Sequence, residues 1–264
     1  MSEEIIFNIT PGDSLKQLKY QWLDTLTSPQ DGMWESFRNN AVHWEVSING
    51  KLAGYACIHN NDVLIQYFVV QEFQAISNSI FHRFILEKNI KDSIVGTNNP
   101  GFLSAALHFQ KEIKLHTYLF REVIPAIVSE KAGTLTLCEI KDLDSIVTFC
   151  HLSVGAPVEW LNGYISDLIS KREVYVLKEK SKIIGTCEVR NSISHPEYAD
   201  IGMIVSPEHR RKGYGTYLLS KASEIAFDQG RKPICSCEVD NMGSFKSISN
   251  SGFISQYQLL AMKF

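Results

Sequence analysis

The sequence feature that most constrains the fold is a basic turn, containing two glycines, between a strand pattern and a helix pattern. The strand-like run covers residues 198–205, and Pro207 ends it. From Gly213 to about Gln229, apolar residues recur at helical spacing, and Gly230 follows as a stop signal. A strand, a tight turn and a helix in this order predict an α/β fold.

The turn itself predicts an anion-binding site. Gly213 and Gly215 let the backbone curl until successive N–H groups point into one concavity, and the helix N-terminus adds the positive end of its dipole. Arg210, Arg211 and Lys212 flank the glycines, so the expected ligand carries phosphates, and a pyrophosphate fits best. The alternative is an ordinary solvated basic surface with a glycine turn.

Two other phosphate-binding motifs do not match this turn. A P-loop needs a longer glycine spacing that ends in Gly-Lys-Ser/Thr. A dinucleotide-binding fold needs three glycines after an early strand and an acidic residue about 20 positions further on. The sequence contains neither pattern.

Charge and composition argue against several classes of partner. The formal net charge of −3 gives no global positive field, so we expect no nucleic-acid partner. Residues 1–4 are acidic where a secretory signal would be basic, and no apolar run approaches the roughly 20 residues that span a bilayer. We therefore expect a cytoplasmic protein with no membrane partner. Six scattered cysteines predict that most are buried, reduced thiols, and the isolated histidines predict no metal site.

The rest of the chain shows one order of elements twice, which predicts a duplicated α/β domain with a boundary near 125–133. In the first half, the expected helices are 15–26, 76–86 and 102–109, and the expected strands are 42–47, 52–58, 63–70, 93–96 and 113–121. In the second half, the expected helices are 142–150, 158–170, 213–229 and 243–250, and the expected strands are 135–138, 174–177, 183–189, 198–205, 233–239 and 253–262.

Two blocks of the second half resemble the GCN5-related N-acetyltransferase (GNAT) superfamily. Arg210-x-x-Gly213-x-Gly215 is similar to the acetyl-CoA signature of that family, and Asn241-x-x-Ser244-x-x-Ser247, followed by Gly252-Phe253, is similar to its second block. The resemblance covers about 133–264. The segment 232–237 and the degenerate first half are similar to two-part bacterial acetyltransferases that include a zwittermicin-resistance protein.

The resemblance implies a GNAT fold of the α+β type, a mixed central sheet flanked by helices. It implies a catalytic domain at 129–264 that binds acetyl-CoA, preceded by a degenerate GNAT-like domain at 1–128. Residues 71–78 of the first half have no glycine pair and no basic cluster, so this half should not hold a pyrophosphate. We expect it to complete the wall of the acceptor pocket.

In the family fold, two strands splay apart, here those carrying 203–205 and 235–239, and pantetheine enters the gap. Backbone groups of the first strand would pair with pantetheine and with the developing oxyanion, and the turn amides would hold the pyrophosphate. The cofactor-binding residues implied in this way are Met203, Ile204, Val205, Arg210, Arg211, Lys212, Gly213, Tyr214, Gly215, Thr216, Asn241 and Ser244.

The catalytic side chains are less clearly marked. Glu188, and Asp200 before the bulge candidate Gly202, are both candidates for the general base, although surface strand carboxylates have the same pattern. The family often has a tyrosine as general acid where this chain has Ile248, so Tyr257 is the candidate substitute. Ser244 and Ser247 are further candidates, acting through water.

The reaction expected from these residues is direct transfer of an acetyl group from acetyl-CoA to a primary amine of a small molecule. A covalent acyl-cysteine at Cys235 or Cys237 is disfavoured, because no His-Asp or His-Asn constellation lies nearby in sequence. The alternative function, motivated by Ile248 and the degenerate repeat, is a non-catalytic acyl-CoA-binding or regulatory module. The sequence leaves a homodimer open.

Overall fold

The computed structural model describes residues 4–60, 62–122, 124 and 128–264. Contacts divide the chain into two compact units. Unit 1 comprises Met1–Tyr118 and Tyr257–Phe264, and unit 2 comprises Leu119–Gln256. The predicted boundary segment, 125–133, lies partly outside the described residues. Within the described residues, no helix is long and apolar enough to span a bilayer.

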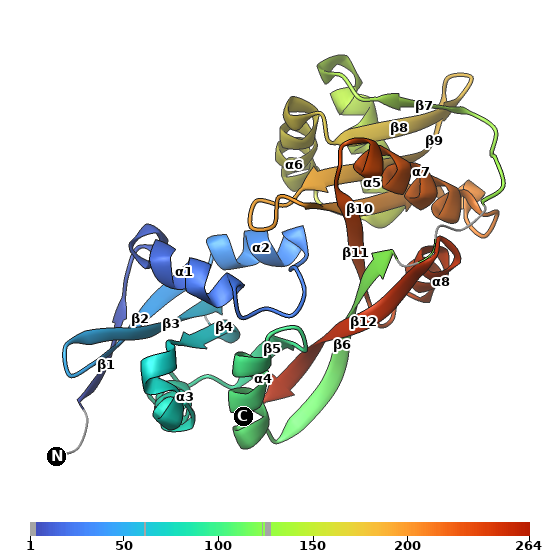
Figure 1. Ribbon diagram of the computed structural model, residues 1–264. Helices are drawn as coiled ribbons and strands as arrows, with labels where there is room; N and C mark the ends of the chain where they lie inside the picture. The colour runs from blue at the N-terminus through green and yellow to red at the C-terminus, as the bar shows by residue number, and fades with distance from the viewer. Residues whose placement is uncertain (1–3, 61, 123, 125–127) are drawn as a thin grey trace. The chain divides into compact units, whose positions relative to one another are not determined.

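Unit 2 contains the elements expected from the sequence (Figure 1). A capping box between Glu139 and Asp142 starts its first helical segment, and Gly155, at a φ of 74°, ends the first α-helix in the left-handed conformation. The elements are β7 (Thr134–Leu137), η3 (Ile140–Asp142), α5 (Leu143–Val154), α6 (Val158–Lys171), β8 (Val174–Glu179), β9 (Lys182–Asn191), β10 (Tyr198–Val205), η4 (Pro207–His209), α7 (Tyr214–Asp228), β11 (Lys232–Glu238) and α8 (Met242–Asn250).

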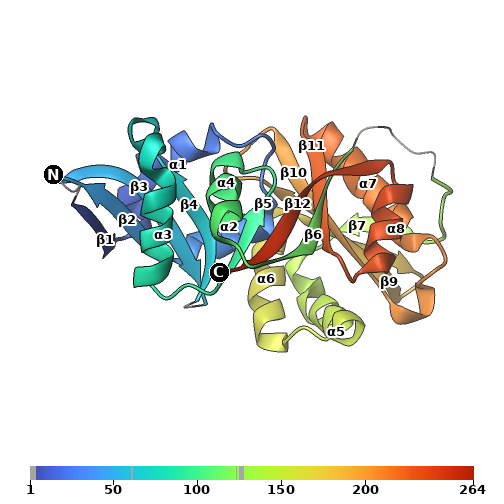
Figure 2. The same cartoon turned by 90° about the horizontal axis from the view of Figure 1, so that it is seen from below.

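The sheet of unit 2 has the order β7-β8-β9-β10-β11, followed by the end of β6 (Glu112–Glu122). β7 to β10 are antiparallel neighbours, and β10 runs parallel to β11. The β10–β11 ladder joins Tyr198–Asp200 to Lys232–Ile234, whereas β10 continues to Val205. The two strands therefore splay apart beyond Asp200, as the family resemblance implies. Figure 2 shows α5 and α6 on one side of this sheet and α7 on the other.

Unit 1 repeats this order of elements, as predicted. Its sheet has the order β1-β2-β3-β4-β5, followed by β12 (Phe253–Lys263). The β4–β5 ladder is also short, pairing Val63 and Leu64 with Asp92 and Ser93. The elements are β1 (Ile5–Ile9), η1 (Gly12–Leu15), α1 (Lys16–Leu23), α2 (Gly32–Asn39), β2 (Val42–Ile48), β3 (Lys51–His59), β4 (Val63–Val69), η2 (Gln71–Ile76), α3 (Ser77–Glu87), β5 (Asp92–Gly96) and α4 (Pro100–Phe109).

The end of the last strand of each repeat lies in the unit of the other repeat. Leu259–Lys263 of β12 pairs antiparallel with Asp92–Gly96 of β5 and belongs to unit 1 by contact. Leu119 onward, in β6, belongs to unit 2. The domain boundary expected from the sequence, between residues 128 and 129, did not include this exchange of strand ends. That boundary stays a prediction.

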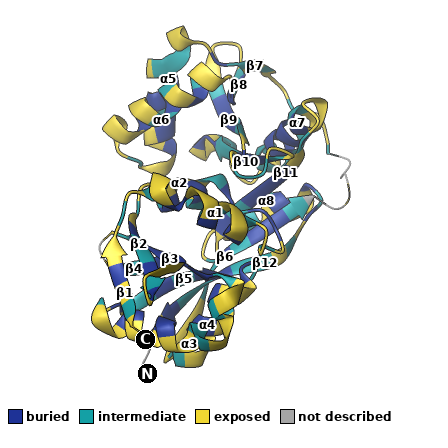
Figure 3. Cartoon of the chain, turned by 60° about the vertical axis from the view of Figure 1, so that its left-hand side comes forward, coloured by how far each residue is buried: buried dark blue, intermediate teal, exposed yellow. Residues whose placement is uncertain are grey.

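Apolar residues of each unit are buried on both faces of its sheet. Figure 3 colours the buried stretches of the ribbon dark blue. In unit 2, Ile146 of α5 and Ile165 of α6 belong to one buried cluster, and Leu218 and Leu219 of α7 are also buried. All six cysteines are buried, which confirms the prediction that most of them are core residues, and their reduced state stays a prediction.

Candidate cofactor and acetyl-transfer site

The turn between β10 and α7 has the geometry of an anion-binding loop. Arg210 is extended, and Arg211 and Gly213 have positive φ values of 59° and 82°. Gly213 is the N-cap residue of α7, and Tyr217 donates a hydrogen bond to its carbonyl at 3.1 Å. The three N–H groups before Tyr217 therefore have no acceptor within the helix, and they lie at the positive end of its dipole.

Arg210 fixes this turn to its surroundings. Its Nε donates to the carbonyl of Val205 at 3.3 Å, and its Nη2 donates to the carbonyl of Ser153 near the end of α5. These bonds connect the turn to the end of β10 and to a helix 57 residues away in sequence. Arg210 therefore orders the turn in addition to bringing positive charge.

Close packing against α8 explains the glycine at 215. A Cβ added there would lie 2.7 Å from the Oγ of Ser247 and 3.3 Å from the Cε of Met203. The Oγ1 of Thr216 donates to the carbonyl of Ser247 at 3.3 Å, which ties α7 to α8. At the start of α8, the side chain of Asn241 accepts a hydrogen bond from the backbone N–H of Ser244 at 3.1 Å. In this structure Asn241 therefore acts as the N-cap of α8.

The residues of β10 that hydrogen bond to β9 determine which of the other backbone groups point toward the gap between β10 and β11. The N–H of Ser206 donates to Ile184 in β9 at 2.9 Å. Because successive residues of a strand direct these groups to opposite sides, Ile204 also faces β9, while Met203 and Val205 face the side of β11. Beyond the end of the β10–β11 ladder, the backbone at Met203 and Val205 is therefore directed into the gap.

A cavity of about 680 Å³ lies between the end of β10, the turn and α8. This volume is in the range of small-molecule sites, about 300–1,000 Å³. The cations Arg210, Arg211 and Lys246 line it, together with Val154 and Asn250, and no acidic residue does so in the described part of the chain. Of the predicted cofactor-binding residues, those in its lining are Met203, Ile204, Val205, Arg210, Arg211, Gly213, Gly215, Thr216, Asn241 and Ser244.

Two of the predicted cofactor residues, Lys212 and Tyr214, do not line this cavity. Lys246, which does, was missed by the sequence reasoning. It lies on α8 between Ser244 and Ser247, so the spacing of the second family block could have pointed to it.

Glu188 and Asp200, the two base candidates, lie in one cluster but in different environments. The Oδ2 of Asp200 is 3.2 Å from Nη2 of Arg190, and the Asp200 side chain is 2% exposed. Glu188 is 14% exposed, and its Oε2 accepts a 2.6 Å hydrogen bond from the hydroxyl of Tyr164 and lies 3.4 Å from Nε of Arg190. Burial, and then the Glu188 carboxylate, raise the pKa of Tyr164 well above its usual range.

Glu188 lies at the mouth of the splay. It is the register partner of Gly202, and a Cβ on Gly202 would stand 3.7 Å from its Oε2. The carboxylate therefore lies beside the backbone of β10 at Gly202, in ordinary van der Waals range of a Cβ placed there. The β9–β10 register is regular from Ala199 to Val205, so the bulge expected at Gly202 is absent from this ladder.

The other candidate side chains are placed less favourably. Tyr257 belongs to unit 1 by contact, where its hydroxyl donates to the carbonyl of Thr27 at 3.3 Å. Ile248 is buried and apolar. Burial, and then Glu238, raise the pKa of Cys237 to about 11, which disfavours a thiolate nucleophile at neutral pH. In the described part of the chain, no group of three or more His, Cys, Asp or Glu side chains is placed to hold a metal ion.

Unit 1 repeats the local geometry without the anion-binding residues. The carbonyl of Val69, at the end of β4, accepts a hydrogen bond from Nε2 of Gln74 at 2.6 Å, five residues later, as Val205 accepts one from Arg210. When Val69 is aligned with Val205 and Gln74 with Arg210, Ser77 occupies the position equivalent to Gly213.

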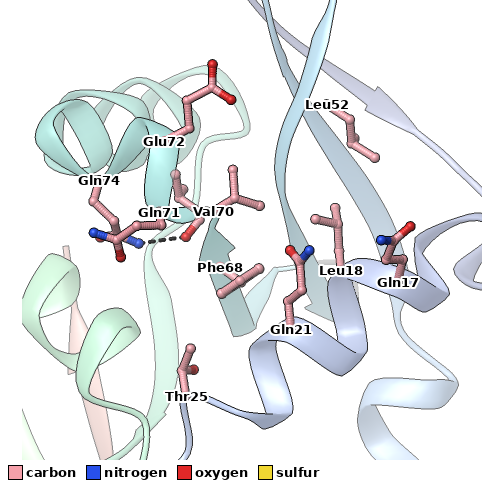
Figure 4. Close-up of a pocket in the computed structure, with 11 residues that line it drawn as sticks. Gln17, Leu18, Gln21, Thr25, Leu52, Phe68, Val70, Gln71, Glu72 and Gln74 are labelled. Atoms are coloured by element: carbon pink, nitrogen blue, oxygen red, sulfur yellow. Dashed lines mark hydrogen bonds between the residues drawn. The ribbon is translucent and has the colours of Figure 1, made fainter.

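The surface beside this turn in unit 1 has a different chemistry. A cavity of about 610 Å³ is lined by glutamines of α1 and η2 and by Leu18 and Phe68 (Figure 4). Its one charged residue in the described lining is Glu72, which lies 3.0 Å from Nζ of Lys51. A neutral to acidic lining disfavours a diphosphate, in agreement with the prediction for this half.

A cationic cavity beside splayed parallel strands, in a sheet flanked by helices, defines an α/β protein with a site suited to an anionic small molecule. Two family models match the chain. One, described as an acetyltransferase (GNAT) domain, matches residues 12–123, and the other, described as the acetyltransferase (GNAT) family, matches residues 140–253. The chain belongs to the GNAT acetyltransferase family and carries two GNAT domains in tandem. The family implies acetyl transfer from acetyl-CoA.

Solved structures agree with this assignment. An acetyltransferase from the GNAT family of Colwellia psychrerythraea is 28% identical, with a TM-score of 0.92 and 99% of each chain covered. A GCN5-related N-acetyltransferase from Sphaerobacter thermophilus is 14% identical, with a TM-score of 0.70 over 98% of this chain and 95% of that one. A tandem GNAT protein from the clavulanic acid biosynthesis pathway is also 14% identical, with a TM-score of 0.66 over 99% and 98%. No curated protein matches the sequence. The narrower likeness to zwittermicin-resistance proteins stays a prediction.

Proposed function

We propose that this protein transfers an acetyl group from acetyl-CoA to a primary amine of a small molecule, with Glu188 as the general base. The observation that carries the proposal is the position of Glu188 beside Gly202, at the point where β10 and β11 separate. The acetyl group would enter this gap from the cofactor side. Glu188 would then face the amine that attacks it.

The cofactor-binding part of the proposal rests on the unit 2 cavity. The turn amides at Gly213, Tyr214, Gly215 and Thr216 would hold the diphosphate, with Arg211 adding positive charge. When bound, acetyl-CoA supplies the reactive thioester. The backbone at Met203, directed into the gap, would orient the acetyl carbonyl and stabilise the oxyanion that develops on it.

Glu188 fits the role of base better than Asp200. An aliphatic amine arrives mostly as an ammonium at neutral pH and must lose a proton before it can attack. Glu188 is partly exposed, and its carboxylate is oriented by the hydroxyl of Tyr164 and by Arg190. Asp200 is almost fully buried against Arg190, so we assign it the role of holding that guanidinium in place.

The acceptor would approach along α6. Tyr164 stacks on Trp160, with ring centroids 4.8 Å apart and an interplanar angle of 14°. Trp160 is 51% exposed, so part of its side chain is accessible to a ligand. Two carboxylates, Glu188 and Asp200, and one guanidinium, Arg190, leave the neighbouring cluster with a net negative charge. This combination favours an amine that carries a flat or cationic group.

The test is a thiol-release assay with acetyl-CoA over a panel of alkyl and aryl amines. We expect Glu188→Gln to lower kcat on a good acceptor at least about 100-fold, the usual effect of removing a general base, with no change in the Kd for coenzyme A. Glu179→Gln, at the exposed end of β8, is the matched control. Full activity of Glu188→Gln would remove the base assignment. Tight coenzyme A binding by the wild type, with no thiol release for any amine, would favour the non-catalytic alternative.

A further inference from the structure

We propose that Lys131 is a phosphate-binding residue of the cofactor site, reaching it from the connection between the two GNAT domains. The inference rests on the cofactor site proposed above. Lys131 lies between the segments that the two family models match, 12–123 and 140–253, so neither family pattern assigns it a role.

The side chain of Lys131 lies directly against the glycine turn. A Cβ added to Gly213 would stand 3.2 Å from both Cε and Nζ of Lys131. The same Nζ is 5.9 Å from the centroid of the Tyr214 ring, on the first residue of α7. The ammonium group therefore lies at the N-terminal end of α7, beside the amides proposed to hold the diphosphate.

A cation in this position is unfavourable unless an anion joins it. The N-terminal end of a helix repels positive charge, and Arg210 and Arg211 already line the adjoining cavity. Glu130, the acid next to Lys131 in sequence, lies 3.4 Å from Nζ of Lys221 instead. A diphosphate at the turn would bind the turn amides and the Lys131 ammonium together, which removes the repulsion.

This contact would couple cofactor binding to the order of the connection. The described part of the connection after residue 127 would be held against α7 when the diphosphate is present. In its absence, only the contact with the Tyr214 ring, at 5.9 Å, holds the ammonium at the turn against the repulsion of the helix end. Cofactor binding should therefore protect the peptide bond after Lys131 from proteolysis.

The first experiment is calorimetric titration of the intact protein with coenzyme A and with dephospho-coenzyme A. We expect Lys131→Met to raise the Kd about tenfold for both ligands, the usual effect of losing one charge-assisted hydrogen bond, and Lys131→Arg to restore most of the affinity. Lys171→Met, which removes an exposed lysine paired with Asp167 on α6, is the control for net charge and should bind as the wild type does.

The outcomes separate this inference from the proposed function. If the wild type binds no coenzyme A, the proposed cofactor site itself is wrong. If the wild type binds and Lys131→Met binds equally well, the role of Lys131 is wrong. A loss for coenzyme A alone, with dephospho-coenzyme A unaffected, would assign the lysine to the 3′-phosphate and overturn the diphosphate contact proposed here.

The second experiment measures the connection directly. Trypsin cleavage of the wild type after Lys131, followed by mass spectrometry, should slow at least about fivefold at saturating coenzyme A, since only unclamped chain is cleaved. Cleavage after Lys180, in the exposed turn between β8 and β9, serves as the internal control and should not change. Equal cleavage after Lys131 with and without the ligand would contradict the coupling.

Discussion

Replacing Gly215 by alanine tests whether close packing of α7 against α8 is required for cofactor binding. The new Cβ would lie 2.7 Å from the Oγ of Ser247, where ordinary van der Waals contact begins at 3.4 Å. Ser247 has to retreat, and its hydroxyl then loses the 3.0 Å bond to the carbonyl of Gly243. Overpacking of this kind costs about 1–3 kcal/mol, against a gain in helix propensity of at most about 1 kcal/mol. We expect a net loss of stability of about 1–2 kcal/mol.

The assay combines thermal unfolding with calorimetric titration of coenzyme A. Each kcal/mol lost should lower Tm by about 2–4 °C, and displacement of α8 should raise the Kd at least about tenfold, because the methyl group and the shifted helix both encroach on the cavity. Gly163→Ala, in α6, is the matched control, since no atom lies within 4 Å of its added Cβ. That variant should gain up to about 1 kcal/mol.

The reasoning on Gly215 would be refuted by one clear result. Gly215→Ala would have to raise Tm as Gly163→Ala does and bind coenzyme A like the wild type. Adding Ser247→Ala removes the atom in closest contact, so the double variant should recover part of the stability, with a coupling energy of at least about 0.5 kcal/mol.

Two further predictions concern stability. The hydrogen bond from Lys178, and then the N–H of Glu139, lower the pKa of Asp142. The ionised carboxylate therefore stabilises the fold above the pKa that Asp142 has in the unfolded chain, and this stabilisation is lost as the pH falls through its lower pKa in the folded protein. Asp142→Asn should therefore lower the free energy of unfolding, measured with urea, by about 1 kcal/mol at pH 7 and leave it unchanged near pH 2. An equal loss at both pH values would contradict this. The fragment 129–264 lacks Phe120, which is buried edge-to-face against Phe245 at 5.5 Å, so near-UV circular dichroism should show loss of fixed packing. A cooperative unfolding transition of that fragment, with full affinity for coenzyme A, would count against this expectation.

The parts of the fold predicted well from sequence are those with a local signal. Helical spacing predicted α7, and Pro207 and Gly230 marked the ends of the neighbouring elements. These signals depend only on residues close together in sequence. The glycine turn was predicted for the same reason. The turn needs a positive φ at Arg211 and at Gly213, and the glycine is a residue type that adopts this conformation readily.

Other features depend on contacts that no local pattern contains. Helix α2 was missed because its eight residues are too few to show a helical period clearly, although Trp34 and Phe37 share one face and pack against the core. The bond from Arg210 to Ser153 joins residues 57 apart, and only the fold brings them together. Similarly, nothing in the sequence of Glu188 separates it from Asp200 as a candidate base. The difference lies in their burial and in the hydroxyl of Tyr164.

The exchange of terminal strands has a consequence for biosynthesis. Strand β5 obtains its β12 neighbour from residues that are translated about 160 positions later, as the bond between Thr97 and Gln258 illustrates. A ribosome adding about 5–20 residues per second needs about 8–30 s for that interval. Throughout it, the nascent amino-terminal sheet has an unpaired edge at β5, and a chaperone that covers this edge would prevent it from pairing with strands of other chains.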